Sequence, residues 1–424
     1  MPHIIILGTC DTKLQELLYL RSQILDNGGD DCKVTLIDAG RSPVQHDAIT
    51  VTQDTLTSKY APEQGSTDVG GLPRGEVISY MIASASKCVR DIYQKGLQDP
   101  SEQVHGIVSA GGTGNTSLAS GVMRATMPIG LPKIIVSTNA STDVSPVVGE
   151  MDITMMPSIV DIAGSNQLLN RILSNAAGAI VGMSKAYERS QRGVQEDSAK
   201  RKKRIGLSMF GVTTPCVDMA REYLEKNYDC ECFIFHQTGA GGKAMERLIA
   251  EGGLDAVCDI TTTELCDHQC GGVMDSGPHR LEAALKAGIP YVISCGALDM
   301  CNFGPRSTVP EKYQNRNLFE HNPTVTLMRT NVEECTAIGQ SIADKVRTHA
   351  KNSKNVSVVL PLGGVSIIAE PKGPFHDPEA DGALFAALRD GLKGSSVAIH
   401  ELQEPINERS SAEFMVKQLV EMMK

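Results

Sequence analysis

The sequence lacks tryptophan entirely, and it has no apolar segment that approaches the roughly 18 residues needed to cross a bilayer as a helix. Its first residues, Met1–Gly8, do not pair a basic stretch with a long apolar segment, which is the pattern of a secretion signal. These two absences favour a cytoplasmic protein that makes no contact with a membrane.

Positive charge is in deficit as well. The chain carries 40 Lys and Arg residues against 50 Asp and Glu residues, which gives a formal net charge of −10. A protein that neutralises nucleic-acid phosphates over a broad surface needs the opposite balance. The basic run at residues 200–204 lies in a polar stretch, and we interpret it as part of a solvated linker. We therefore expect no nucleic-acid partner.

The twelve cysteines do not form the compact framework of a secreted, disulfide-bonded module. They are spread through apparent strands and helices, so we interpret most of them as reduced thiols of the core. Cys266 and Cys270 flank Asp267 and His268, but this spacing lacks the paired ligands of structural zinc sites. The sequence therefore predicts no metal site.

Glycine, in contrast, is abundant, and it often follows short apolar runs rich in β-branched residues. Ile4–Leu7 precedes Gly8, and Ile107–Val108 comes shortly before Gly111. Segments with a helical spacing of apolar residues, such as Lys13–Leu25, lie between such runs. Buried strands that alternate with helices are typical of an open parallel sheet.

This pattern fades over residues 184–204 and then resumes. We therefore predict an α/β protein with two Rossmann-like open parallel-sheet domains and a ligand cleft between them. The predicted parts are an N-terminal α/β nucleotide-binding domain (1–184), a linker (185–204) and a C-terminal α/β substrate domain (205–424).

Three segments of the first half contain candidate ligand contacts. Gly8–Lys13 follows a strand and opens a helix, so backbone amides, hydroxyls and an ammonium group surround a helix N-terminus. Ser109–Thr116 has small residues that let a backbone approach phosphate oxygens. Ser137–Asp143 ends the next strand with hydroxyl and amide side chains, among them Thr138 and Asn139. Helix capping or turn formation are the alternative roles for these segments.

Asp38 ends the second predicted strand. An acid at this position often accepts a hydrogen bond from a ribose hydroxyl, although it is also a common helix cap. Both roles are open at this point.

In the second half, Thr238–Met245 repeats the anion-site pattern with Lys243 in reach. Residues 294–330 gather acidic, amide, imidazole and guanidinium groups in loop-like sequence, and guanidinium forks suit carboxylates and phosphates. The candidate catalytic or substrate-binding residues are Asp299, Asn302, Arg306, His321 and Arg329. The alternative is a buried Arg–Asp pair that only holds two loops together.

Five short segments in combination resemble the family of the tomato tobamovirus-resistance protein. They are Gly8–Lys13, Gly111–Thr116, Gly296–Gly304, His321–Pro323 and Met328–Thr330. The resemblance covers nearly the whole chain and implies an ATP-binding region of two α/β subdomains. In longer members a TIM-barrel domain follows, which we do not find in this sequence. By this resemblance the phosphates of ATP, with or without magnesium, would contact Thr9, Asp11, Thr12, Lys13, Gly111, Gly112, Thr113, Gly114, Asn115 and Thr116.

Three hypotheses for function follow. The first is a nucleotide-binding protein, or an enzyme, that holds phosphates in the first domain and a small anionic substrate against the second. The second is a hydrolase or lyase of a small carboxylated metabolite that does not use ATP. The third is an interaction protein regulated by a nucleotide. We also expect a homodimer or a higher homo-oligomer.

Overall fold

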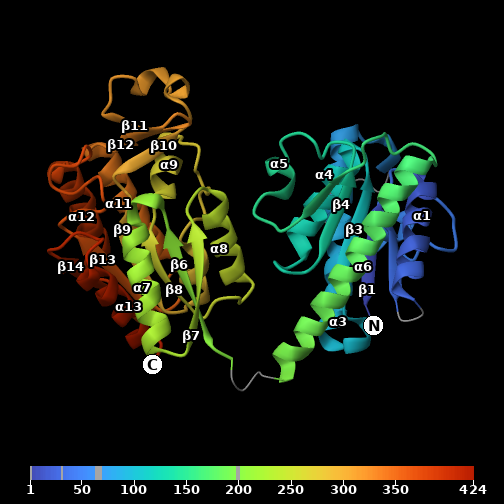
Figure 1. Cartoon of the computed structure of the whole chain (residues 1–424), viewed down its shortest axis with the longest axis horizontal. Coiled ribbons are helices and arrows are strands. Elements are labelled where there is room, and N and C mark those ends of the chain that lie inside the picture. Colours follow the sequence, from blue (N-terminus) through green and yellow to red (C-terminus); the bar gives the residue numbers. More distant parts are fainter. Residues whose placement is uncertain (1, 30–31, 63–68, 197–200) are drawn as a thin grey trace. The chain divides into compact units, whose positions relative to one another are not determined.

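The computed structural model describes residues 2–29, 32–62, 69–196 and 201–424 (Figure 1). The chain divides into two compact units, Met1–Arg201 and Lys202–Lys424. Each unit is an α/β domain with its own parallel sheet. Among the described residues, no helix combines the length and the apolar composition that crossing a bilayer requires.

The N-terminal domain is built on a five-stranded parallel sheet in the order β2-β1-β3-β4-β5. Ile4 and Ile6 of the first strand pack on one face of the sheet, and Ile5 and Leu7 pack on the other. Burial on both faces explains why this strand is a continuous apolar run. The strands are β1 (His3–Gly8), β2 (Lys33–Asp38), β3 (Gly106–Gly111), β4 (Lys133–Ser137) and β5 (Thr154–Pro157).

Helices cover both faces of this sheet. One face packs against α1 (Cys10–Gly28) and α6 (Gln167–Glu196), and the other against α3 (Arg74–Gln98) and α4 (Thr113–Thr126). The short helices are α2 (Gln53–Ser58) and α5 (Ser145–Val148).

The segment that the sequence pattern assigned to a linker is helical over much of its length. Helix α6 continues to Glu196, and the first strand of the second domain, β6, begins at Lys203. Residues 197–200, which include the first lysine of the basic run, lie outside the described part of the chain.

The C-terminal domain has a six-stranded parallel sheet in the order β14-β13-β9-β8-β6-β7. One face packs against α7 (Thr214–Asn227) and α13 (Arg409–Met422). The other packs against α8 (Ala240–Ala250), α9 (Glu264–Cys270), α10 (Glu282–Ala287), α11 (Val332–His349) and α12 (Pro378–Leu392). The strands are β6 (Lys203–Met209), β7 (Cys230–His236), β8 (Ala256–Thr261), β9 (Tyr291–Gly296), β13 (Val356–Pro361) and β14 (Ala398–Leu402).

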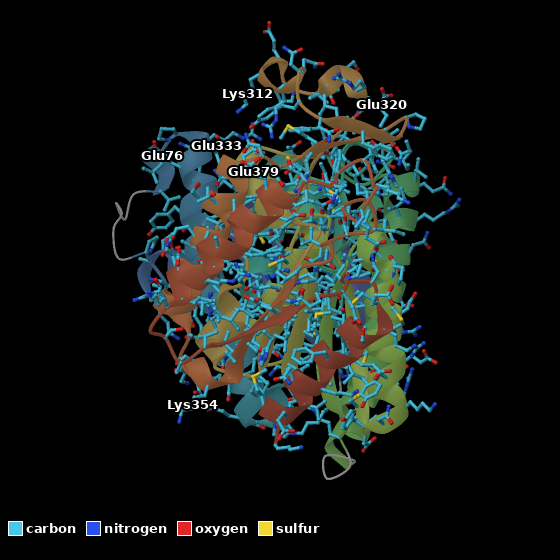
Figure 2. All side chains as sticks on the ribbon, turned by 90° about the vertical axis from the view of Figure 1, so that its left-hand side faces the viewer. Glu76, Lys312, Glu320, Glu333, Lys354 and Glu379 are labelled. Carbon is cyan, nitrogen blue, oxygen red and sulfur yellow. The ribbon has the colours of Figure 1, made fainter. Side chains whose placement is uncertain are left out.

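Helices α11 and α12 begin at the same end of the domain. Glu333 and Glu379, both labelled in Figure 2, lie in their first turns. Acidic side chains at this position interact favourably with the positive end of a helix dipole.

Residues 294–330, expected to be loop-like, contain a small antiparallel sheet in the order β10-β12-β11. Its strands are β10 (Met300–Phe303), β11 (Leu318–Asn322) and β12 (Val325–Arg329). The loop expectation was wrong here because β10 is buried along its whole length, so its polar residues are packed inside the domain.

Counted along the chain, the first five strands of both parallel sheets have the same order: second, first, third, fourth, fifth; the C-terminal sheet adds a sixth strand at the end. In this arrangement the connections after the first and third strands diverge, which leaves a crevice at the carboxyl ends of those two strands. The crevice lies between β1 and β3 in the N-terminal domain and between β6 and β8 in the C-terminal domain. The prediction of two Rossmann-like α/β domains is confirmed, whereas the cleft between the domains stays a prediction.

Candidate functional site

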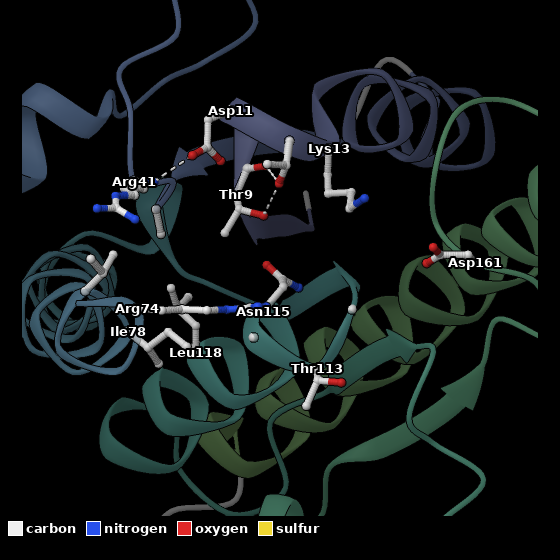
Figure 3. A pocket seen from close by; sticks show the side chains of 15 residues that line it. Thr9, Asp11, Lys13, Arg41, Arg74, Ile78, Thr113, Asn115, Leu118 and Asp161 are labelled. Atoms are coloured by element: carbon white, nitrogen blue, oxygen red, sulfur yellow. Dashed lines mark hydrogen bonds between the residues drawn. The ribbon is translucent and has the colours of Figure 1, made fainter. Parts of the chain in front are cut away.

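The crevice between β1 and β3 holds a cavity of about 440 Å³ (Figure 3). Its walls come from the loops after both strands, from the start of α3 and from a loop after β5. It is lined by Thr9, Asp11, Thr12, Lys13, Ala39, Arg41, Arg74, Val77, Ile78, Gly112, Thr113, Gly114, Asn115, Leu118 and Asp161. The cavity therefore lies at the switch point that the strand order defines.

The N-terminus of α4 opens on this cavity. The first backbone bond into the helix runs from Thr116 N to Gly112 O at 2.9 Å. The amides of Thr113, Gly114 and Asn115 precede it, and they have no acceptor among the described residues. Free amides at the positive end of a helix are a ready binding site for an anion.

Gly111 and Gly112 have different roles in this loop. A Cβ atom at Gly111 would lie 2.6 Å from the Cβ of Asn115, so this glycine lets the strand end pack closely on α4. A Cβ atom at Gly112 would meet only Thr138 Oγ1, at 3.8 Å. A side chain at Gly112, which lines the cavity, would thus narrow the space at its wall with little crowding of the protein.

Asn115 places a polar group inside the cavity wall. Its side chain is 6% exposed, and its Nδ2 donates to Ser109 Oγ at 2.8 Å. Its Oδ1 has no hydrogen-bond partner in the part of the chain that the structure describes. Figure 3 shows this amide directed into the cavity on the side of Thr9. A bound molecule that offers a donor here would satisfy a buried acceptor that is otherwise left unpaired.

Two cations face the same space. Lys13 follows β1 on α1, and Arg74 opens α3. Neither side chain has a hydrogen-bond or ion-pair partner among the described residues. Arg41, also in the wall, is held instead by backbone carbonyls, because its guanidinium donates to Gly70 O and to Leu72 O.

The predicted acids of this region are held by backbone amides. Asp38 is fully buried, and its Oδ1 accepts from Cys10 N at 3.0 Å and from Gly40 N at 2.9 Å. Burial raises the pKa of Asp38. Asp11 lines the cavity, and its Oδ2 accepts from Arg41 N at 2.9 Å, a bond drawn in Figure 3.

The remaining predicted contacts lie behind or beside the cavity. Thr116 is 1% exposed, and its Oγ1 bonds Gly112 O at 3.0 Å and Ser137 Oγ at 2.7 Å. Asn139 donates its backbone amide to the same Ser137 hydroxyl. Thr138 lies in the wall of a second cavity.

The predicted residues of the C-terminal domain fall into separate groups. Arg329, which is 3% exposed, donates to Asp381 Oδ1 at 2.6 Å, and this is a buried Arg–Asp pair of the kind considered as the alternative. Fully buried Asp299 accepts from Ser366 Oγ at 2.7 Å. Burial raises the pKa of Asp299 to about 7, although the positive charge of Arg329 opposes this rise.

The other three predicted residues bond elsewhere or face solvent. Buried Asn302 donates to Asp267 Oδ2 at 2.7 Å, and Arg306 donates to Gln314 Oε1. His321 is exposed on β11. The structure thus brings Asp299 and Arg329 together, and the catalytic roles of all five residues stay predictions.

The anion loop predicted at Thr238–Met245 is filled by a carboxylate of the chain itself. Glu264 Oε1 accepts from Gly239 N at 2.7 Å and from Gly242 N at 3.1 Å. The same carboxylate also accepts from Arg280 Nε at 2.9 Å. The expectation of ligand contact was therefore wrong for the amides of Gly239 and Gly242, because these already have an internal acceptor.

Sequence models for the N-terminal and C-terminal domains of the uncharacterised protein family UPF0261 match residues 2–189 and 202–423. The chain belongs to UPF0261. It is 42% identical over 424 residues to a UPF0261 protein of Clostridium tetani, covering 99% of this chain and 98% of that protein. It is 35% identical over 436 residues to the ToMV resistance protein Tm-1(GCR237) of Solanum lycopersicum, covering 99% of this chain and 56% of that protein. The resemblance to the tobamovirus-resistance-protein family is confirmed.

Several cavity residues of this UPF0261 member were missed at the level of sequence. Arg41 lies three residues beyond the strand-end acid and could have been found by extending that motif. Arg74, Val77 and Ile78 start a helix that carries no ligand-binding signature. Asp161 follows β5, far from the other wall residues in sequence, and only the sheet topology brings it to the site.

Proposed function

We propose that the N-terminal domain of this UPF0261 protein binds ATP in the cavity between β1 and β3. The observation that carries this proposal is the unbonded N-terminus of α4, whose three free amides belong to residues that line the cavity beside the uncrowded Gly112. A triphosphate satisfies these donors, and the helix dipole favours its charge.

The cations of the wall add to this anion site. Lys13 and Arg74 approach the cavity from different helices, so they suit an extended chain of phosphates better than a single carboxylate. A guanidinium group binds two phosphate oxygens at once, whereas an ammonium group acts as a compact charge.

The apolar part of the wall suits a nucleobase. Val77, Ile78 and Leu118 lie on α3 and α4 beside the free helix N-terminus. A cavity of about 440 Å³ is within the range of roughly 300–1,000 Å³ that is typical of small-molecule sites. The unpaired Oδ1 of Asn115 would accept from an amino or hydroxyl group of the nucleoside.

Magnesium would be held by the phosphates together with a wall carboxylate. Mg²⁺ commonly uses one or two carboxylates plus phosphate oxygens. Asp161 fits this role because it lines the cavity and has no partner among the described residues, whereas Asp11 is engaged by the amide of Arg41. The ion would neutralise part of the phosphate charge.

Calorimetry on the full chain tests the proposal. We expect saturable binding of ATP with magnesium, and we expect Gly112→Val to weaken it at least tenfold because the valine side chain enters the cavity. The stability of this variant should stay within about 0.5 kcal/mol of wild type, because the added Cβ atom would meet only Thr138 Oγ1, at an ordinary contact distance of 3.8 Å. Gly182→Val, at an open glycine on α6, is the matched control and should bind as wild type does.

Titrations with citrate and pyruvate test the alternative hypothesis that the protein is an enzyme that acts on a carboxylated metabolite and does not use ATP. Binding of either carboxylate without binding of ATP, or equal ATP affinity in folded Gly112→Val, would contradict the proposal.

A further inference from the structure

A second cavity, of about 450 Å³, lies at the carboxyl ends of β4 and β5. It adjoins the nucleotide cavity, because Asp161 lines both and because Thr138 lies next to Gly112. Its chemistry comes mainly from Ser137, Thr138, Ser141, Ser158, Ile159 and Asp161.

The wall of this second cavity differs in charge from that of the first. It contains four hydroxyl groups and one carboxylate, but no lysine or arginine. Two of the hydroxyls are used inside the protein: Ser137 Oγ bonds Thr116 Oγ1, and Ser158 Oγ donates to Val160 O at 2.6 Å. The hydroxyls of Thr138 and Ser141 and the carboxylate of Asp161 have no side-chain partner among the described residues. The cavity therefore offers hydrogen bonds without attracting negative charge.

Ile159 adds an apolar surface held in an unusual backbone conformation. Its φ angle is +63°, and Val160 N donates to Ser158 O at 2.7 Å across it, which makes a γ-turn with a positive central φ. Side chains branched at Cβ rarely adopt this conformation, and such strain clusters at binding sites. Ile159 is also 75% exposed, so the strain is not offset by burial of its side chain.

We propose that this second cavity binds a hydroxyl-bearing organic molecule without negative charge, next to the nucleotide. This inference rests on the proposed function, because it names the second ligand of the same site. Thr138 and Ser141 exchange hydrogen bonds with its hydroxyls, beside the Asp161 carboxylate that lines both cavities. Ile159 packs against its carbon skeleton, since an exposed aliphatic surface among polar groups matches the mixed faces of a polyol or sugar.

Saturation-transfer difference NMR on the full chain, with ATP and magnesium present, tests this subsite. The probes are glucose, glucosamine and glucuronate, which share a ring and differ in charge, together with glycerol and myo-inositol. We expect signals from glucose and glucosamine and at least a fivefold weaker signal from glucuronate. No signal from any uncharged probe, or equal signals from glucose and glucuronate, would overturn the inference.

Ile159→Gly separates a binding role from a structural role. Glycine relieves the positive φ and removes the apolar surface, so we expect the melting temperature to stay the same or rise while the glucose signal falls at least fivefold. Ile367→Gly, at an exposed isoleucine of the other domain, is the matched control and should leave the signal unchanged. An unchanged glucose signal in folded Ile159→Gly would also overturn the inference.

The two proposals fail in different ways. ATP affinity should be unaffected in Ile159→Gly, because this side chain is not in the wall of the nucleotide cavity. Absence of ATP binding to the wild type would refute the proposed function and, with it, the placement of a second ligand beside a nucleotide. ATP binding without any probe signal would refute only the second subsite.

Discussion

The two domains share the order of their first five strands, but the crevice between the first and third strands is open in the N-terminal domain and filled by side chains in the C-terminal domain. In the N-terminal domain, Gly111, Gly112 and Gly114 surround a helix start whose amides are unbonded. In the C-terminal domain, the corresponding strand β8 is followed by Thr262, Thr263 and Glu264 instead of glycines. The same topology therefore yields an open cavity in one domain and a packed junction in the other.

Internal hydrogen bonds close the second crevice. Thr213 Oγ1 and Thr261 Oγ1 lie 2.7 Å apart and join the segment after β6 directly to the last residue of β8. Glu264 turns its carboxylate to the amides that begin α8, and Arg280 neutralises it. The difference teaches that a glycine-rich loop at a helix N-terminus marks a ligand site only when no side chain of the protein already accepts from its amides.

The largest expected effect on stability comes from removing Arg280, which neutralises the carboxylates that fill the crevice of the C-terminal domain. Arg280 is 1% exposed and bonds Asp259 through two contacts of 2.6 Å as well as Glu264. Arg280→Met leaves these buried carboxylates without their cation, so we expect the C-terminal domain to lose about 3–5 kcal/mol of its free energy of unfolding. Urea denaturation followed by circular dichroism measures this loss.

Arg74→Met in the open cavity is the contrasting variant. Its guanidinium is exposed and has no partner among the described residues, so the change should alter stability by less than about 0.5 kcal/mol. Equal stability losses in the two variants would contradict the distinction between a filled and an open crevice.

The next largest effect is expected in the pH dependence of the stability of the C-terminal domain. Burial raises the pKa of Asp299, in the C-terminal domain, from 3.8 to about 7. The folded state therefore holds this proton more tightly than the unfolded state does. The stabilisation from this bound proton is complete below pH 3.8, the pKa of the unfolded state, and is lost as the pH rises through about 7, the pKa of the folded state. At about 1.4 kcal/mol per pKa unit, the loss is on the order of 4 kcal/mol.

Asp299→Asn removes this titration. We expect the variant to show a flatter dependence of unfolding free energy on pH between 4 and 8 than the wild type, measured by urea titrations at several pH values. Parallel pH profiles for the two proteins would mean that the pKa of Asp299 is the same in the folded and unfolded states, which would contradict this expectation.

A smaller effect is expected at the cations of the open cavity. Lys13→Gln and Arg74→Gln each remove one charge that faces the phosphates, and we expect each to weaken ATP binding about tenfold, or about 1.4 kcal/mol. Lys243→Gln, on the loop filled by Glu264, is the matched control and should bind ATP as the wild type does. Calorimetry in one buffer compares the three variants, and a loss of affinity in Lys243→Gln would place the nucleotide elsewhere.

The sequence was sufficient to predict the fold because local patterns determine it. The apolar run of β1 and the glycine after it specify a buried strand and a turn, and the same pattern repeats in both halves. The loops after β1 and β3 could be proposed as one site, since parallel strands bring their carboxyl ends to one edge of a sheet.

Long-range pairing could not be predicted in the same way. The loop at Gly239 has the composition of an anion site, and nothing nearby in sequence indicates that Glu264 fills it. Asp38 has the position of a ribose contact, but its carboxylate caps Cys10 and Gly40 inside the domain. In each case the role of the residue depends on a hydrogen-bond partner from another segment of the chain. The residue types in the local sequence do not identify that partner.

Hydrogen–deuterium exchange of the backbone amides tests the central distinction most directly. Without ligand, the amides of residues 113–115 should exchange fast because they lack acceptors, whereas those of Gly239 and Gly242 should exchange slowly because they donate to Glu264. We predict that ATP with magnesium slows exchange at 113–115 and leaves Gly239 and Gly242 unchanged. Protection of Gly239 and Gly242 by ATP, with no change at 113–115, would contradict the account.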